Sequence, residues 1–529
     1  MHLGSLRVDD SRDRLVRKGD YVYGSFMRPE QVDGYINGIN PGDRSDVLGR
    51  FCFSGASVDD AIDHARLAAR IWGTVSVPDR ATCLKRFRQA VAKSRERLVQ
   101  IITRETGKPV WESRSEVIET LKTLDVLLDR GLRALSPIVL DDQPGRSDRL
   151  ARGVVVILCP YNQPVLITAT YCAAAILGGN SVVYKPSKFT PGSGQLIAEL
   201  WDQCRMPRGV VNMVQGSGSG VGKRLIAHPD IDALVVTGSF STAMEVRRAI
   251  FDRPDLQVIY ESGGKGIAVV LDGCDMDRAV YEVMTGSFLT TGQRHDSTGR
   301  VIVEQSIYER FVSMLVDQTK RLDVGYGFDS EVFMGPVISE NSRSRFRRYG
   351  RALAQKGHRA LLEGQSLTRT NQRGFYVSPA IHEVDWTGGS AFLNEEPPGP
   401  TLLVYPVRGI DEALALHNQA YYRLSCALFP SQEHDLDYLA SRLRTGRLLI
   451  NRATTTRALT LPAVGLGRAG TGSDNGIGLV EKLTYPRAHM VETRAFDATY
   501  TLPGTNWDDI PSDQLMEVEA DVSAMLEPT

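Results

Sequence analysis

Apolar residues recur at helical spacing in two segments near the N-terminus, residues 57–72 and residues 78–109. We predict a helix over each segment, and therefore a chain that begins with helices. Ser57 and Asp60 have the spacing of an N-terminal cap for the first of these helices.

From Arg152 the pattern changes to short runs of β-branched residues separated by helical segments. The first set of runs reads RGVVVILCP, SVVYKP, GVVNMVQG, IDALVVTGS and LQVIYESGG. Short buried strands that alternate with helices are typical of a parallel, doubly wound sheet. A second set, KGIAVVL, RVIVEQ, TLLVYPV, SCALFP and GRLLIN, predicts another α/β domain over about residues 263–461. Two such domains facing each other would leave a cleft between them.

The composition narrows the classes of function. With 529 residues the chain exceeds what one hydrophobic core usually serves, so two or more large units are expected. Lys and Arg number 62 against 63 Asp and Glu, and the net charge of -1 argues against a nucleic-acid binder or a basic membrane-surface protein. We therefore expect a small-molecule substrate, and neither nucleic acid nor membrane as a partner.

The cysteines and the lengths of the apolar stretches indicate the cellular compartment in which we expect the protein. The seven cysteines are scattered without a CxxC pair, which suits a reducing cytosol and gives neither a disulfide framework nor a metal site. No apolar stretch approaches the length of a transmembrane helix, so we expect a soluble, cytoplasmic protein.

Residues 500–529 are acidic and follow Arg494, the last basic residue. We predict a peripheral extension there, with a short helix near residues 512–526.

Residues that could bind a ligand or take part in catalysis cluster where the predicted strands end. The motifs are CPYNQP (159–164), VVYKPSKFTP (182–191), VTGSFSTA (236–243) and ESGGKG (261–266). An asparagine amide in a strand-end loop is a neutral donor that can be aimed at a carbonyl oxygen. Ser239 stands at a predicted helix N-terminus, where backbone amides attract phosphate. QGSGSGVG (215–222) fails as a dinucleotide fingerprint, because Val221 takes the place of the third glycine.

These motifs, in this order and with the loop TTGQRHDSTGR (290–300), resemble the aldehyde dehydrogenase superfamily over about residues 19–490. The run GRLLINRATTTRALTLPAVGLGRAGTGSDN is similar in particular to N-succinylglutamate semialdehyde dehydrogenases. The resemblance implies an α/β fold of two doubly wound α/β domains with a small bridging β element that supports homodimers or homotetramers. It divides the chain into an N-terminal extension (1–18), a cofactor-binding domain (19–262) with a bridging segment at about 136–152, a catalytic domain (263–461), a C-terminal return with a bridging strand (462–499) and an acidic tail (500–529).

The resemblance implies catalytic roles for three residues and marks one replacement among them. His295 stands where the family's Gly-Gln-x-Cys loop has its nucleophilic cysteine, and an imidazole does not simply substitute for a thiolate. Asn162 matches the asparagine whose amide helps to hold the developing oxyanion. Glu261 matches the glutamate that activates the deacylating water. Asp296, next to His295, replaces a small polar residue.

The resemblance also implies a cofactor, NADP or NAD, and a set of residues to bind it: Lys185, Lys188, Gly216, Gly238, Ser239 and Glu396. Lys185 matches the lysine on the adenosine ribose, Ser239 the serine at the pyrophosphate, and Glu396 the glutamate on the nicotinamide ribose. Lys188 replaces the glutamate that NAD-using members often hold against the ribose 2'-hydroxyl. Because an ammonium attracts a 2'-phosphate that a carboxylate would repel, we favour NADP.

Two further departures lie beside the expected cofactor. Ala243 replaces a glycine, and its methyl would either crowd the cofactor or adjust the packing of the helix. Pro397 and Pro398 follow Glu396 and remove the family's phenylalanine beside the nicotinamide, so that the loop is stiff but lacks the aromatic wall.

Three functions remain open at this point. The first is an NAD(P)-dependent oxidoreductase acting on a semialdehyde-like small molecule, or on its hydrate, lactol or hemiaminal, with Glu261 or His295 as the base and no thioester. The second is a pseudoenzyme that binds cofactor or partners without turnover. The third is a non-redox enzyme that uses the same cleft.

Overall fold

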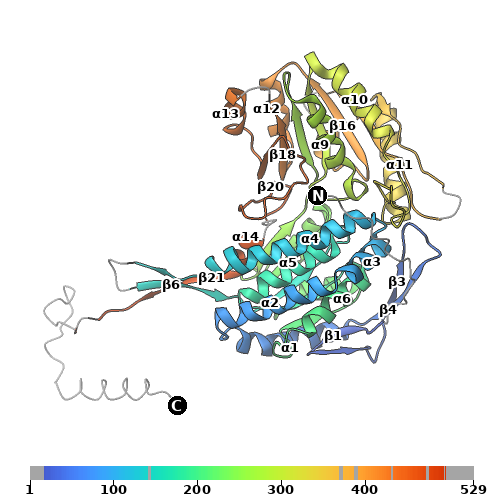
Figure 1. The fold of residues 1–529 in the computed structure, drawn as a ribbon. Helices are drawn as coiled ribbons and strands as arrows, with labels where there is room; N and C mark the ends of the chain where they lie inside the picture. The colour runs from blue at the N-terminus through green and yellow to red at the C-terminus, as the bar shows by residue number, and fades with distance from the viewer. Residues whose placement is uncertain are drawn as a thin grey trace, which may run out of the picture. The chain divides into compact units, whose positions relative to one another are not determined.

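The computed structural model of the protein describes residues 17–140, 145–368, 373–385, 391–430, 433–471, 476–493 and 495. Most of the predicted N-terminal extension, and the acidic tail with its predicted helix, lie outside the described residues. The chain divides into two units, residues 1–136 with 149–486, and residues 137–148 with 487–529. Figure 1 labels their helices and strands.

The first unit contains two large sheets, the first with the strand order β11-β10-β7-β8-β9-β1-β2. Its parallel strands are β7 (Val154–Leu158), β8 (Ser181–Lys185), β9 (Val211–Met213), β10 (Ala233–Thr237) and β11 (Gln257–Glu261). These are the five runs that the β-branched pattern predicts. Two short antiparallel strands, β1 (Asp20–Val22) and β2 (Ser25–Met27), extend the sheet beyond β9.

The second sheet has the order β14-β15-β16-β13-β12-β18-β19. The strands that pair in parallel are β12 (Gly266–Val270), β13 (Thr298–Glu304), β15 (Ala380–Glu383), β16 (Thr401–Val407), β18 (Ser425–Phe429) and β19 (Arg447–Ile450). Only the edge strand β14 (Ala360–Leu362) runs antiparallel to its neighbour. The prediction of two doubly wound α/β domains is therefore confirmed.

Helices cover both faces of each sheet. One face of the first sheet packs against α5 (Pro164–Leu177) and α6 (Pro191–Asp202). On these two helices pack α2 (Val77–Lys93), α3 (Arg95–Thr106) and α4 (Val110–Val126). The other face packs against α1 (Ala56–Trp72), α7 (Lys223–Ala227) and α8 (Phe240–Ala249). The second sheet lies between α9 (Met276–Phe288) with α10 (Tyr308–Lys320), and α11 (Glu340–Gln355) with α12 (Ile410–Gln419) and α13 (Glu433–Ala440).

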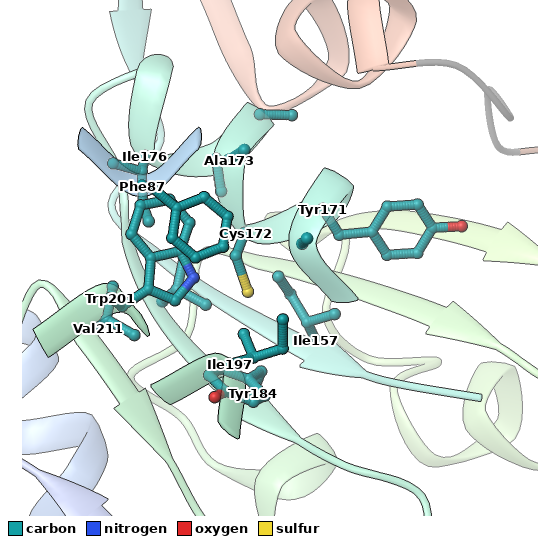
Figure 2. Packing of buried hydrophobic residues seen from close by; sticks show 14 of the residues in the cluster. Phe87, Ile157, Tyr171, Cys172, Ala173, Ile176, Tyr184, Ile197, Trp201 and Val211 are labelled. Carbon is teal, nitrogen blue, oxygen red and sulfur yellow. The ribbon is translucent and has the colours of Figure 1, made fainter. Parts of the chain in front are cut away.

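The core beneath α5 is packed around aromatic rings (Figure 2). Phe87 of α2 and Trp201 of α6 stack face to face, with ring centroids 3.5 Å apart and planes 2° from parallel. Cys172 of α5 lies beside them and is fully buried. Every residue of α5 is buried, because α5 lies between the sheet and a second layer formed by α2 and α4. This explains why its sequence is apolar on all sides.

Three local predictions are wrong. The described chain begins with strands, because β1, β2, β3 (Gly34–Ile39) and β4 (Val47–Phe53) precede the first helix. These strands depend on antiparallel pairing with distant or neighbouring chain, which the local pattern does not show. The single helix expected over residues 78–109 is two helices, because Ser94 leaves the helical conformation between α2 and α3.

The third error concerns the cap of α1. The helix begins at Ala56, its N-cap is Gly55, and no side chain caps it. Ser57 lies inside the first turn and is buried, where its hydroxyl hydrogen-bonds the carboxylate of Asp20. The serine therefore serves a tertiary contact rather than the helix end.

The small β element is a three-stranded sheet of order β21-β6-β5. Its strands are β5 (Ile138–Val139), β6 (Gly145–Ala151) and β21 (Thr484–Met490). Ile138 and Val139 are 65% and 63% exposed. Among the described helices, none has both the length and the apolar character needed to cross a membrane.

Candidate active site

Five predicted site residues lie at the carboxyl ends of the parallel strands of the first sheet. They are Asn162 after β7, Lys185 at the end of β8, Gly216 after β9, Ser239 after β10 and Glu261 at the end of β11. Because the strands are parallel, all five lie along one edge of the sheet. The chain winds outward from β7 through β8 and β9 and then returns to β10, on the other side of β7. Such a switch point is where open α/β sheets bind ligands.

The loop before His295 has three consecutive residues in the left-handed conformation. They are Thr290 (φ 53°), Thr291 (φ 56°) and Gly292 (φ 63°). For a β-branched residue this conformation costs about 1–3 kcal/mol, so the surroundings must impose it. Glu112 of α4 does so by accepting hydrogen bonds from the Thr290 backbone amide, at 3.1 Å, and from its hydroxyl. The Thr291 hydroxyl donates to the Gly335 carbonyl at 3.0 Å, so the loop is held from two sides.

Asn162 and the loop are joined through Gln293. The Gln293 carbonyl accepts a hydrogen bond from Asn162 Nδ2 at 3.0 Å, and its side-chain oxygen accepts one from the Ile338 amide at 2.9 Å. The Asn162 side-chain oxygen accepts from the Gln163 amide at 2.9 Å, which turns the NH₂ group toward the loop. An amide NH₂ has two hydrogens, and the bond to Gln293 uses one of them. The other can be given to a substrate oxygen.

A buried ion pair sets the position of the Asn162 backbone. Lys108 Nζ lies 2.5 Å from a carboxylate oxygen of Glu116 and 2.9 Å from the Asn162 carbonyl. The other Glu116 oxygen accepts from the amides of Val165 and Leu166, at 2.8 and 3.1 Å. Glu116 therefore caps the N-terminus of α5, where an anion is favoured by the helix dipole. Through Lys108 the same carboxylate fixes the loop that carries Asn162.

His295 lies against the turn that follows β11. A Cβ atom added to Gly263 would be 2.5 Å from the His295 Cβ, and Gly263 has φ 69°. The His295 carbonyl accepts from the Lys265 amide at 3.1 Å, and its Nδ1 is buried without a hydrogen-bond partner among the described residues. Burial lowers the pKa of His295 to about 4, aided by the charges of Arg457, Arg447 and Arg294 and opposed by Asp296. The imidazole is therefore neutral at pH 7.

Asp296 is committed to arginines rather than to His295. Arg294 reaches its carboxylate with two nitrogens, at 2.9 and 3.0 Å, and Arg447 approaches to 3.6 Å. Burial alone would raise the pKa of Asp296, but the charge and hydrogen bonds of Arg294 and the charge of Arg447 hold it far below its usual range. The replacement next to His295 thus belongs to a buried ion cluster, and Asp296 stays ionised.

Glu261 is the last residue of β11, and Gly263, which lies against His295, follows two residues later. Glu261 is 2% exposed, and its carbonyl accepts from the Gly238 amide at 3.0 Å. This bond joins the turn to the start of the α8 segment that carries Ser239. The charge of Glu261 also opposes the lowering of the Lys482 pKa by burial, so a cation lies near its carboxylate.

Lys185 lies under the loop after β9. Its ammonium donates to the carbonyls of Pro186 and Gly216, at 2.8 and 3.2 Å, and the side chain is 6% exposed. Burial lowers its pKa to about 8, aided by the charge of Lys188. Gly216 (φ 152°) packs on Val221, to which a Cβ would come within 2.4 Å. The residue that breaks the dinucleotide fingerprint is therefore a buried support for this loop.

Ser239 is the N-cap of α8, and its hydroxyl oxygen accepts from the Thr242 amide at 3.2 Å. It is exposed, as expected of a group that meets a ligand. Ala243 is buried in the core between α8 and the sheet, so its methyl adjusts the packing of the helix. Lys188 is exposed and lies over the Phe189 ring at 5.2 Å, with no contact to Lys185 or Ser239 beyond its charge.

The loop that carries Glu396 is clamped by its carbonyls. Lys265 Nζ donates to the Gly399 carbonyl at 2.6 Å, and the backbone there leaves no room for a side chain on Gly292. Arg345 of α11 donates to the Glu396 carbonyl at 3.5 Å. Burial lowers the pKa of Lys265 to about 7, opposed by the charge of Glu396. Glu396 is thereby placed beside the turn at Gly263–Lys265 and the loop before His295.

The comparisons with known proteins agree with this geometry. The model of the aldehyde dehydrogenase family matches residues 26–488. The chain belongs to the aldehyde dehydrogenase family. It is 30% identical to an N-succinylglutamate 5-semialdehyde dehydrogenase of Escherichia coli over 477 residues, 88% of this chain and 95% of the relative. A Burkholderia ambifaria protein of the same name is 29% identical over 86% of this chain and 93% of its own length. The crystal structure of PnpE from Pseudomonas sp. WBC-3 is 27% identical, with a TM-score of 0.85 and coverage of 91% of this chain and 99% of that one.

The family's motifs account for most of the positions predicted from sequence, but several supporting residues of this aldehyde dehydrogenase family member were missed. They are Lys108, Glu112, Glu116, Lys265 and Arg345. A signal was present for two of them, since Glu112 and Glu116 are acidic residues one turn apart that lie on the buried side of α4. Gln293 joins Asn162 to the loop before His295, and His295 lies against the Gly263 turn that follows Glu261. The charge of Glu396 acts on Lys265 of that turn, whereas Lys188 is exposed.

Proposed function

We propose that the protein is an NAD(P)-dependent oxidoreductase that acts on a small semialdehyde, or on its hydrate or hemiaminal, without a thioester intermediate. The observation that carries this proposal is a neutral imidazole at His295, in the loop whose Gln293 carbonyl accepts one amide hydrogen of Asn162 and leaves the other available. Cys159, the cysteine nearest in sequence to Asn162, is no substitute nucleophile because burial raises its pKa to about 12. The names of the relatives support the semialdehyde class.

The residues present fit a nicotinamide nucleotide. An ammonium has three hydrogens, and Lys185 uses two on backbone carbonyls, which leaves one for a ribose hydroxyl. The exposed N-terminus of α8 at Ser239 suits a pyrophosphate, and the methyl of Ala243 points into the core instead of toward it. Gly216 and Gly238 would keep the backbone close to the nucleotide, and Glu396 would hold the nicotinamide ribose. A bound nucleotide would supply the acceptor for the hydrogen and the electron pair that leave the substrate carbon.

The protein's own residues then have three tasks. His295, being neutral, accepts a proton from a hydroxyl of the hydrated aldehyde as the carbon–hydrogen bond breaks. Asn162 donates its second amide hydrogen to the oxygen that gains charge. Glu261 is the alternative base, and its carboxylate would take the proton instead. The sum is an aldehyde hydrate converted to a carboxylic acid, with a hydride equivalent transferred and one proton released.

A pseudoenzyme is the second candidate, and one observation favours it. A histidine with a pKa of about 4 is a weak base, and its Nδ1 is buried. Such a ring can fill the space of a thiol without doing its work. A non-redox enzyme in the same cleft is not supported by any contact of the described residues.

Turnover of a semialdehyde with NAD or NADP, followed by the absorbance of the reduced cofactor, tests the proposal. The unmodified protein should oxidise the substrate, and His295→Ala should reduce the rate by about 100-fold, the usual contribution of one general base. His64→Ala, outside the site, should change nothing. Oxidation that appears only in His295→Cys would show that the natural protein is not a dehydrogenase. Equal rates for the protein and His295→Ala would remove His295 from the chemistry.

The preference for NADP rests on Lys188. Its exposed ammonium can reach a 2'-phosphate at the carboxyl edge of the sheet, where Lys185 holds the ribose. Lys188→Glu should shift the ratio of NADP to NAD binding toward NAD, as measured by fluorescence quenching. Lys122→Glu on α4 makes the same change of charge away from the site and is the control. An unchanged ratio in Lys188→Glu would exclude the lysine from cofactor choice.

We also infer that the protein forms a homodimer or homotetramer through its small β element. The exposed apolar residues Ile138, Val139, Leu140, Met490 and Val491 support this. Several exposed apolar residues on one small element are typical of an interface. Light scattering should give the mass of an oligomer, and Ile138→Asp with Val139→Asp should reduce it to that of a single chain.

A further inference from the structure

A cavity of about 530 Å³ lies under α11, at the edge of the second sheet. Its walls come from α11, from β14 and the chain after it, and from β15. None of the residues discussed as the active site lines it. The volume is in the range of small-molecule sites in proteins.

The floor of the cavity contains a buried polar group without a partner. His382 of β15 is 5% exposed, and its Nδ1 makes no hydrogen bond with any described residue. Burial, with a contribution from His358, lowers the pKa of His382 to about 4, so the ring is neutral. A buried donor or acceptor left unpaired is unfavourable by about 1–3 kcal/mol, and native proteins rarely keep one without a reason. A ligand that reached the floor would give this nitrogen its missing partner.

The helix α11 has a glycine, Gly350, where it lines the cavity. Gly350 stands inside the helix, where glycine is about 1 kcal/mol less favourable than alanine. A Cβ atom added there would meet no atom within 4 Å, so nothing in the described protein requires a glycine by packing. The open space belongs to the cavity, which Gly350 lines. The sequence thus keeps an unfavourable residue where it enlarges the cavity.

The charge of the cavity favours an anion. Arg347 and Arg351 stand one turn apart on the face of α11 that lines it, and both are exposed. Neither forms an ion pair with a described residue. Among the described residues that line the cavity, Glu363 is the only carboxylate, so two cations face one anion there. Arginine suits carboxylate and phosphate groups, because its donors form a planar fork.

We propose that this cavity is a binding site for a small organic anion with a carboxylate or phosphate group. The anionic group pairs with Arg347 and Arg351 at the mouth, the carbon skeleton covers Phe346 and Gly350, and a polar atom bonds to His382 at the floor. The site is separate from the proposed active site and does not depend on the proposed function.

Calorimetric titration of the full-length protein with succinate, glutamate and inorganic phosphate tests this. At least one of the three should bind with a dissociation constant below about 1 mM. Arg351→Ala and Gly350→Leu should weaken that binding at least about tenfold, a large change for the loss of one contact or the filling of the cavity. Arg348→Ala, on the same helix but not on the lining, is the matched control and should bind as the unmodified protein does.

Two further measurements separate binding from folding. Gly350→Ala should raise the thermal midpoint of the free protein, because the added methyl meets nothing, and it should narrow the site without unfolding it. The imidazole ¹⁵N signals of His382, assigned through His382→Gln, should move when the anion is added. The proposal is wrong if none of the three anions binds at about 10 mM. It is also wrong if Gly350→Leu and Arg351→Ala leave the affinity unchanged, since the anion then binds elsewhere.

Discussion

The buried pair between Lys108 and Glu116 makes the sharpest prediction about how this site is supported. Both side chains are 3% exposed or less, and the Glu116 carboxylate accepts from one ammonium and two backbone amides. Glu116→Gln keeps the shape of the side chain but leaves the Lys108 ammonium buried without an anion. Neutralising one partner of such a pair costs about 3–5 kcal/mol of the free energy of unfolding, because the remaining charge stays out of water.

The substitution of the other partner, Lys108→Met, should lower the free energy of unfolding by less than Glu116→Gln does. In Lys108→Met the Glu116 carboxylate keeps the amides of Val165 and Leu166 at the N-terminus of α5, so its charge remains solvated by the protein. The double variant removes both charges and should be more stable than Glu116→Gln alone. We therefore expect a coupling energy of about 2–3 kcal/mol in a double-mutant cycle.

Urea unfolding of the four proteins measures these differences. The control is the exposed pair of Arg133 with Asp129, whose side chains are 77% and 57% exposed. Asp129→Asn should change the free energy of unfolding by less than about 0.5 kcal/mol. If Glu116→Gln proves no more costly than Asp129→Asn, the pair is not shielded from water, and its role in fixing Asn162 is refuted.

Three further predictions concern stability and the packing around His295. His417 is 1% exposed, and burial lowers its pKa from 6.5 to about 4. Between these two values the unfolded chain binds more protons than the folded protein, so the free energy of unfolding falls as the pH falls. Urea unfolding should therefore show that the unmodified protein loses about 1 kcal/mol of its free energy of unfolding, relative to His417→Gln, between about pH 8 and about pH 5.5. A difference between the two proteins that stays constant with pH would contradict the buried neutral ring. Gly263→Ala puts a methyl 2.5 Å from the His295 Cβ at φ 69°, so it should displace His295 and lower the thermal midpoint, whereas Gly409→Ala, with no atom near, should not. Trp201→Ala removes the ring stacked on Phe87 and should cost about 3–5 kcal/mol in urea unfolding, while Phe251→Ala, at a side chain 85% exposed, should cost almost nothing; similar losses would contradict the packing of Figure 2.

The regular part of the fold was open to prediction from the sequence. The β-branched runs between Arg152 and Ile450 became the parallel strands of two sheets, because a strand buried on both faces must be apolar along its whole length. The strand-end motifs placed Asn162, Lys185, Ser239 and Glu261 on one edge for the same reason. Parallel strands put their carboxyl ends together whatever the intervening helices contain.

The short N-terminal strands and the helix boundaries were not open to prediction in this way. β1 is three residues long and exists because Tyr21 pairs with Met213 at the edge of a distant sheet. Ser57 looked like a helix cap, but it bonds to Asp20. Such contacts join residues far apart in the chain, and no local pattern records them.

The sequence by itself determined the class of the fold and the presence of His295 in the loop that follows α9. Only the tertiary structure decided the state of that histidine. His295 is neutral because burial and three arginines outweigh the adjacent Asp296, whose charge is taken up by Arg294 and Arg447. Read from the sequence, a histidine beside an aspartate suggests a charged pair. The pKa of His295 depends instead on which charges the fold brings close to the ring and on how much water the fold removes from it. Neither can be inferred from the sequence around His295.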